Sequence, residues 1–107
     1  MDKELKRRWV EALRSGKYEQ GNGCLRFGSE TFCCLGVLAD VADPEGWEND
    51  ASASERFHRL GSAKDSEGYL RGSILALGTQ RTLAGLNDRG RSFGEIADYI
   101  EKRIGEG

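Results

Sequence analysis

Proline, cysteine and histidine are scarce in this sequence, and each scarcity argues against a class of structure. A single proline among 107 residues, Pro44, excludes proline-rich linkers. Three cysteines are few and odd in number, so we expect free thiols and no disulfide framework. Because the chain has one histidine, His58, and no C-x-x-C pair, it offers no standard set of zinc ligands. We therefore expect no metal and no other cofactor.

The sequence also lacks a long hydrophobic run and an excess of charge of one sign. No apolar stretch approaches the ~20 residues that cross a bilayer, and the first residues, MDKELKRRWVEALRSG, lack the apolar core of a secretory signal. The 16 basic and 18 acidic residues give a net charge of −2, which provides no general attraction to nucleic acid or anionic membrane. We expect a cytoplasmic protein that binds neither DNA nor membranes.

The length and composition indicate one small domain, residues 1–107. Hydrophobic residues make up 37% of the chain, which is enough for one modest core. Fifteen glycines are about twice the average usage and predict many tight turns. Residues 44–72 show no periodicity and are rich in small and charged residues. We expect them to form a long, variable, irregular loop with room for a short strand or turn.

A first helix is predicted after the N-cap candidate Asp2, with its end at Ser15-Gly16. Its predicted core stripe, at helical spacing, contains Leu5, Trp9, Ala12 and Leu13. Its opposite side aligns Lys3, Arg7 and Arg14. This basic row is either a stripe that faces an anion or a solvated face, and solvated faces are the commoner of the two.

Residues 24–33 predict a β-hairpin, because Gly28-Ser29 suits a two-residue turn. Such a turn pairs Phe27 with Glu30 and fixes which side chains share a face of the sheet. The face expected in the core contains Leu25, Phe27 and Phe32. The face expected to be more open contains Cys24, Arg26, Thr31 and Cys33.

The remaining helical patterns lie at 34–42 and in the C-terminal third. The central helix should end at Asp43-Pro44, since a proline disfavours helix in the residue before it. A short helix opens at Thr79 or Gln80, and the capping box Ser92-Phe93-Gly94-Glu95 begins the last helix. One face of that helix contains Phe93, Ile96, Ala97, Ile100 and Ile104. The predicted class is α+β: an N-terminal helix, a β-hairpin, a central helix, a long irregular loop and a C-terminal helix pair.

The adjacent cysteines Cys33 and Cys34 lie where the predicted strand meets the central helix. A thiol at a helix N-terminus gains thiolate character, but a nucleophile also needs a base, and the one candidate is His58 in the loop. Packed core cysteines are the commoner outcome. We expect Cys34 to begin the helix and Cys33, on the side of Arg26, to border a ligand pocket, with neither thiol doing covalent chemistry.

The segment LRSGKYEQGNGCLRFG predicts a site for an anion. Glycine amides can approach an anion, and flanking arginine or lysine side chains can pair with phosphate oxygens. Tyr18 could stack on a base and Gln20 could hydrogen-bond its edge. The spacing matches no standard phosphate-binding motif, and a plain glycine-rich connector remains the alternative. The candidate ligand-binding residues in this segment are Arg14, Lys17, Tyr18, Gln20, Gly21 and Arg26.

The order of a short helix, a turn and a capped helix in TLAGLNDRGRSFGEIADYI resembles a helix-turn-helix. The outward face of the last helix is acidic and would be repelled by phosphates, so we do not expect DNA binding. Asn87 and Asp88 in the turn either hydrogen-bond backbone groups or reach a ligand. Both stay in the set of candidate ligand-binding residues, together with Cys33.

Three blocks of the chain resemble a family of small proteins encoded by tailed phages. The blocks are WVEALRSGKYEQGNGCLR, FCCLGVLADVA and LAGLNDRGRSFGEIADYIE, and together they cover roughly half of the sequence. The resemblance implies a setting, the cytoplasm of an infected bacterium. It carries no activity and no functional residue.

The leading hypothesis is a non-enzymatic counter-defence protein that sequesters a nucleotide-like anionic signalling molecule. A homodimer is the expected assembly, since two small subunits can enclose a ligand that one cannot. A second hypothesis is a protein-protein inhibitor of a host defence factor, acting through the acidic segment 43–50. A third is a cysteine hydrolase that uses Cys33 or Cys34 with His58.

Overall fold

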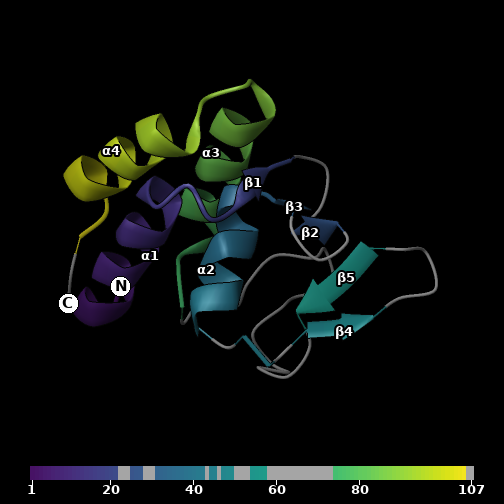
Figure 1. Ribbon diagram of the computed structural model, residues 1–107. Coiled ribbons are helices and arrows are strands. Elements are labelled where there is room, and N and C mark those ends of the chain that lie inside the picture. The colour runs from purple at the N-terminus through teal and green to yellow at the C-terminus, as the bar shows by residue number, and fades with distance from the viewer. Residues whose placement is uncertain are drawn as a thin grey trace.

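The computed structural model describes residues 1–21, 25–27, 31–42, 44–45, 47–49, 54–57 and 74–105 (Figure 1). The helices among these residues are α1 (Lys3–Arg14), α2 (Cys34–Ala42), α3 (Leu77–Asp88) and α4 (Phe93–Arg103). The strands are β1 (Glu19–Gln20), β2 (Arg26–Phe27), β3 (Thr31–Phe32), β4 (Trp47–Asn49) and β5 (Ser54–Phe57). Helices packed beside a largely antiparallel sheet confirm the α+β class. No helix in the described ranges is both long and apolar enough to cross a bilayer.

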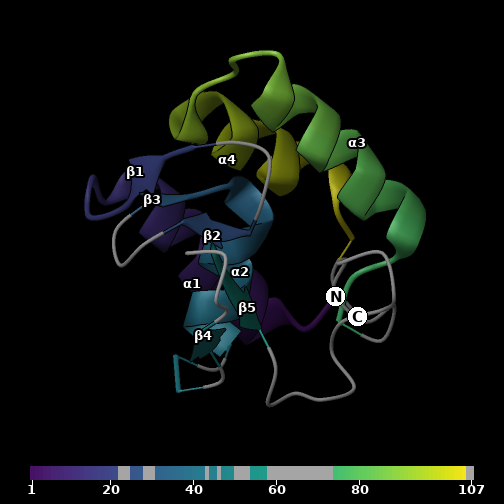
Figure 2. The ribbon, with the colours of Figure 1, turned by 90° about the vertical axis from the view of Figure 1, so that its right-hand side faces the viewer.

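The strands form one sheet in the order β1-β3-β2-β5-β4. β1 runs parallel to β3, and the other neighbours are antiparallel. The helices gather on one side of the molecule, and β5 and β4 extend away from them (Figure 1). A second view shows α3 and α4 above the end of the sheet that carries β1 (Figure 2).

β4 and β5 lie in the segment 44–72, for which the prediction was a long irregular loop with room for one short strand or turn. The two strands pair with each other, and β5 also pairs with β2, so this region adds two strands to the predicted hairpin. Short strands are held by backbone hydrogen bonds, which need no apolar alternation in the sequence. Pro44 and Glu45 form a turn before β4, and the other residues of the predicted loop lie outside the described residues.

β2 and β3 confirm the hairpin but not its register. Phe27 faces Thr31 and Arg26 faces Phe32, whereas the prediction paired Phe27 with Glu30. Three residues rather than two therefore separate the last paired positions, and the predicted two-residue turn is wrong. A change of one residue gives every side chain a different cross-strand partner. Arg26 consequently lies next to Phe32, with its guanidinium carbon 5.2 Å from the ring centroid.

α1 has the predicted ends but a rotated core face. Asp2 Oδ2 accepts a hydrogen bond from Leu5 N at 2.8 Å, and the helix ends before Gly16, whose φ of +76° suits glycine. Leu5 and Ala12, predicted in the core, are partly buried. The buried residues are Lys6, Trp9, Val10 and Leu13. α1 contacts both α2 and α4, so a wider arc of its surface is covered than one stripe (Figure 1).

The C-terminal helices follow the predicted pattern closely. α3 begins at Leu77, two residues before the predicted Thr79, and it ends before Gly90, whose φ is +86°. The capping box of α4 is present, with Ser92 Oγ accepting from Glu95 N and the Glu95 carboxylate accepting from Ser92 N. All five residues of the predicted apolar face of α4 are buried.

Candidate anion-binding groove between α1 and α4

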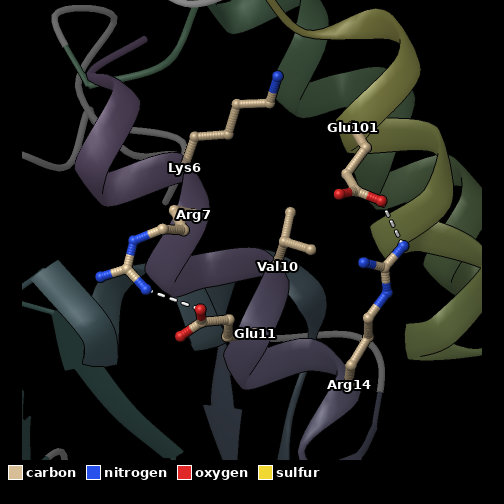
Figure 3. Close-up of a pocket in the computed structure, with 6 residues that line it drawn as sticks. All are labelled: Lys6, Arg7, Val10, Glu11, Arg14 and Glu101. Atoms are coloured by element: carbon tan, nitrogen blue, oxygen red, sulfur yellow. Dashed lines mark hydrogen bonds and ion pairs between the residues drawn. The ribbon is translucent and has the colours of Figure 1, made fainter.

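A groove with a volume of about 390 Å³ lies between α1 and α4 (Figure 3). Its lining residues are Lys6, Arg7, Val10, Glu11 and Arg14 from α1 and Glu101 from α4. The α1 residues share this side because helical positions three and four apart lie on one face. Three cations and two carboxylates therefore surround one apolar side chain, Val10, which lies near the centre of the view.

Arg14 forms one end of the groove and links α1 to α4. Its Nη2 atom lies 2.6 Å from Asp98 Oδ1 and 2.6 Å from Glu101 Oε1. The hydrogen bond from Arg14 lowers the pKa of Glu101. The pKa of Arg14 is raised in turn, mainly by its hydrogen bond to Glu101 and then by the one to Asp98. The Arg14 side chain is still 39% exposed, so a solute can reach its guanidinium.

Arg7 forms the other end of the groove and is also paired with two carboxylates. It contacts Glu4 on its own helix, and its Nη1 atom lies 2.7 Å from Glu11 Oε1. The hydrogen bond from Arg7 lowers the pKa of Glu4, and the hydrogen bonds to Glu4 and Glu11 raise the pKa of Arg7. The basic row predicted on α1 is thus largely neutralised by neighbouring carboxylates at these two positions.

Lys6 is a buried cation on the wall of the groove. It is 8% exposed, and its Nζ atom donates to the carbonyl of Ile104 at 2.7 Å. This carbonyl lies at the C-terminal end of α4, where a positive charge interacts favourably with the helix dipole. Sequence reasoning did not select Lys6. The available signal was its position three residues before Trp9 and four before Val10, which places a lysine on the buried side of the helix.

The groove contains the side chains that bind anions. Among the described residues that line it, none carries a thiol, a hydroxyl or an imidazole. Arginine side chains bind phosphate and carboxylate oxygens bidentately, and two arginines lie at opposite ends of one cavity. Among the described residues, no group of three or more His, Cys, Asp or Glu side chains could hold a metal ion.

Gln20, Gly21 and Asn87, predicted to contact a ligand, are brought together but used inside the fold. Asn87 is 3% exposed, and its Oδ1 atom accepts from Cys34 N at 3.2 Å and from Gln20 Nε2 at 3.0 Å. Its Nδ2 atom donates to Gly21 O at 2.7 Å. Gln20 Nε2 also donates to Arg91 O, and Gln20 Oε1 accepts from Phe93 N. This network joins β1 to α2, α3 and α4. Of the two alternatives predicted for Asn87, the structure shows hydrogen bonds to backbone groups.

Tyr18 and Arg26 lie together on another part of the surface, beside Phe32. The Tyr18 and Phe32 rings meet edge to face with centroids 4.9 Å apart, and the Tyr18 hydroxyl donates to Asp40 Oδ2 at 2.6 Å. Neither Tyr18 nor Arg26 lines the groove between α1 and α4. Lys17 and Asp88 are exposed and also lie outside its lining.

Tyr18 makes a testable contribution to stability at high pH. Burial, and then the hydrogen bond to Asp40, raise the pKa of Tyr18 to about 12, above the ~10 of an unfolded chain. The neutral phenol therefore contributes stability that is fully present below pH ~10 and is lost as the pH rises through ~12. We expect Tyr18→Phe to reduce the loss of unfolding free energy between these values. Urea unfolding of both proteins from pH 9 to 12 measures it, and equal slopes would contradict the assignment.

The two described cysteines are core residues. Cys34 is fully buried, its thiol lies 3.6 Å from Leu83 O, and burial raises its pKa, which weighs against a nucleophilic thiolate. Cys33 is 9% exposed, so the prediction that it lies on a more open face of the hairpin is wrong. Its Sγ atom accepts from Gly36 N and its carbonyl accepts from Val37 N, because Cys33 comes directly before α2. That Cys33 borders a ligand pocket stays a prediction. Cys24 and His58 lie outside the described residues.

The model of a protein family described as a domain of unknown function, DUF8296, matches residues 1–75. The chain belongs to the DUF8296 family. In this DUF8296 chain the matched region includes the α1 wall of the groove, whereas Glu101 and Asn87 lie beyond it. Comparison with curated proteins and with solved structures gives no match.

Proposed function

We propose that the protein sequesters an anionic, nucleotide-like small molecule in the groove between α1 and α4. The observation that supports this is that Lys6, Arg7 and Arg14 all line one groove, with the two arginines on opposite sides of Val10 (Figure 3). A phosphate group gains charge-assisted hydrogen bonds from arginine, and lysine adds a point charge. The proposed role is capture without turnover.

Of the candidate ligand-binding residues predicted from the sequence, the proposed site includes Arg14. It does not include the glycine-rich segment that follows Arg14. The polar atoms of Gln20 and Asn87 are engaged within the protein, so a ligand could use them only by breaking the contacts between β1, α3 and α4. The arginines of the groove, by contrast, are paired with exposed carboxylates at the surface.

The resemblance to tailed-phage proteins supports a setting for this capture. We propose that the ligand is a nucleotide signal of a bacterial host and that its removal counters a defence response. The homodimer stays a prediction. Sedimentation equilibrium with and without ligand would measure the molecular mass and so test it.

Calorimetric titration tests the proposal directly. We expect a cyclic dinucleotide or a cyclic ADP-ribose isomer to release heat with the parent protein. Arg14→Ala should weaken the binding about tenfold or more, because a charge-assisted arginine contact contributes roughly 1.5–3 kcal/mol. Arg89→Ala is the matched control, since Arg89 is exposed and lies outside the groove lining. Circular dichroism should show all three proteins folded.

Two results would count against the groove as the site. No heat from any nucleotide, with the protein folded, would remove the proposed function. Equal weakening in Arg14→Ala and Arg89→Ala would show a general charge effect instead of binding in the groove.

A further inference from the structure

We infer that the ligand of the groove carries two separated anionic groups, which replace the carboxylates of Glu11 and Glu101 on Arg7 and Arg14. The inference rests on the proposed function. It names the class of ligand and identifies two side chains of the protein as its competitors.

Each arginine of the groove holds two carboxylates, and one of each pair lies in the lining. Arg7 contacts Glu11, which lines the groove, and Glu4, which does not. Arg14 contacts Glu101, which lines the groove, and Asp98, which does not. Figure 3 shows the two lining pairs at opposite ends of the cavity, with Val10 between them. The groove therefore already contains two negative groups bound to its two arginines.

The contacts that a ligand must replace are weak ones. The side chains of Glu11 and Glu101 are 63% and 52% exposed, and exposed ion pairs contribute little to stability because water screens them. A released carboxylate regains its hydration at the surface. A terminal phosphate or phosphonate group brings more charge and more acceptor oxygens to the same guanidinium than a carboxylate does. Exchange is thus favoured most for ligands whose two anionic groups are terminal.

The positions of the arginines set the spacing of the ligand's charges. Arg7 and Arg14 are seven residues apart on one helix, which corresponds to about 10 Å along its axis at 1.5 Å per residue. The two guanidinium groups lie at opposite ends of the groove (Figure 3), so in this arrangement a bidentate pair with each of them calls for a separate anionic group. A ligand with two phosphates and a less polar part between them would match the two ends of the groove and Val10 at its middle.

The test uses a series of α,ω-alkane bisphosphonates of increasing length, with inorganic phosphate as the single-group probe. We expect one length to bind the parent protein at least tenfold more tightly than phosphate. Glu11→Gln and Glu101→Gln should each tighten that binding several-fold. The matched controls Glu4→Gln and Asp98→Asn remove the same charge from the same arginines outside the lining, and we expect them to change affinity less than twofold.

The outcomes separate this inference from the proposed function. Binding of phosphate or a nucleotide that depends on Arg14, but not on probe length or on the lining carboxylates, would overturn the inference alone. Equal tightening by the lining variants and their controls would also overturn it, as a general charge effect. No binding of any nucleotide, phosphate or bisphosphonate would remove the proposed function and the inference together.

Discussion

Asn87→Ala is expected to lower the free energy of unfolding by about 3 kcal/mol. The side chain is 3% exposed and satisfies two backbone groups from distant elements, the first amide of α2 at Cys34 and the carbonyl of Gly21. Alanine would leave both groups without this partner, and each unsatisfied buried group costs roughly 1–3 kcal/mol. The amide of Gln20 would lose its contact with Asn87 as well.

Urea unfolding followed by circular dichroism measures this effect, and Asp88→Ala is the control. Asp88 is the next residue along the chain but is exposed, so its replacement should change stability by less than ~0.5 kcal/mol. Thermal unfolding should show a fall in melting temperature of ~10 °C or more for Asn87→Ala. A loss below ~1 kcal/mol would mean that the network around Asn87 does not hold β1, α2 and α3 together.

Gly36→Ala is expected to destabilise the protein by about 3 kcal/mol or more. Gly36 lies in α2, and a Cβ atom there would be 1.7 Å from the carbonyl oxygen of Leu25 and 2.7 Å from its carbon. These are backbone atoms, so no side-chain rotation can relieve the clash. The same carbonyl accepts a hydrogen bond from Cys33 N at 3.1 Å, which fixes it against the start of the helix.

A second helical glycine gives the opposite expectation and serves as the control. Gly85 in α3 has open space where a Cβ atom would be, so Gly85→Ala should stabilise the protein by up to ~1 kcal/mol through helix propensity. Both variants can be compared by thermal unfolding under one condition. Equal effects would contradict the close approach of α2 to Leu25, since propensity alone favours alanine at both positions.

Asn87 and Gly36 act on the same region of the molecule, the start of α2. Asn87 caps the first amide of the helix, and Cys33 Sγ accepts from the amide of Gly36 two residues later. Trp9 Nε1 donates to Cys34 O at 3.0 Å from α1. The adjacent cysteines therefore lie at a junction where β3, α1, α2 and α3 meet, and their burial follows from this packing rather than from any chemistry of the thiols.

Local features of the sequence predicted the helices well. α4 begins at a capping box and buries its predicted face, because both features depend on residues within a few positions of each other. α1 begins after Asp2 for the same reason. The hairpin register and the two further strands were not predictable this way. A difference of one residue in the length of a turn changes every cross-strand pair of the hairpin. The pairing of β2 with β5 joins segments that are far apart in the sequence, so no local pattern indicates it.

The sequence by itself determined the fold class, the start of α4 and both ends of α1, and the presence of arginines on one side of α1. Only the tertiary structure decided what those polar residues contact. Arg14 meets Asp98 and Glu101, 84 and 87 residues away, and Asn87 meets Cys34 and Gly21, 53 and 66 residues away. Such partners share no local pattern, since they are brought together by the burial of apolar faces elsewhere in the chain.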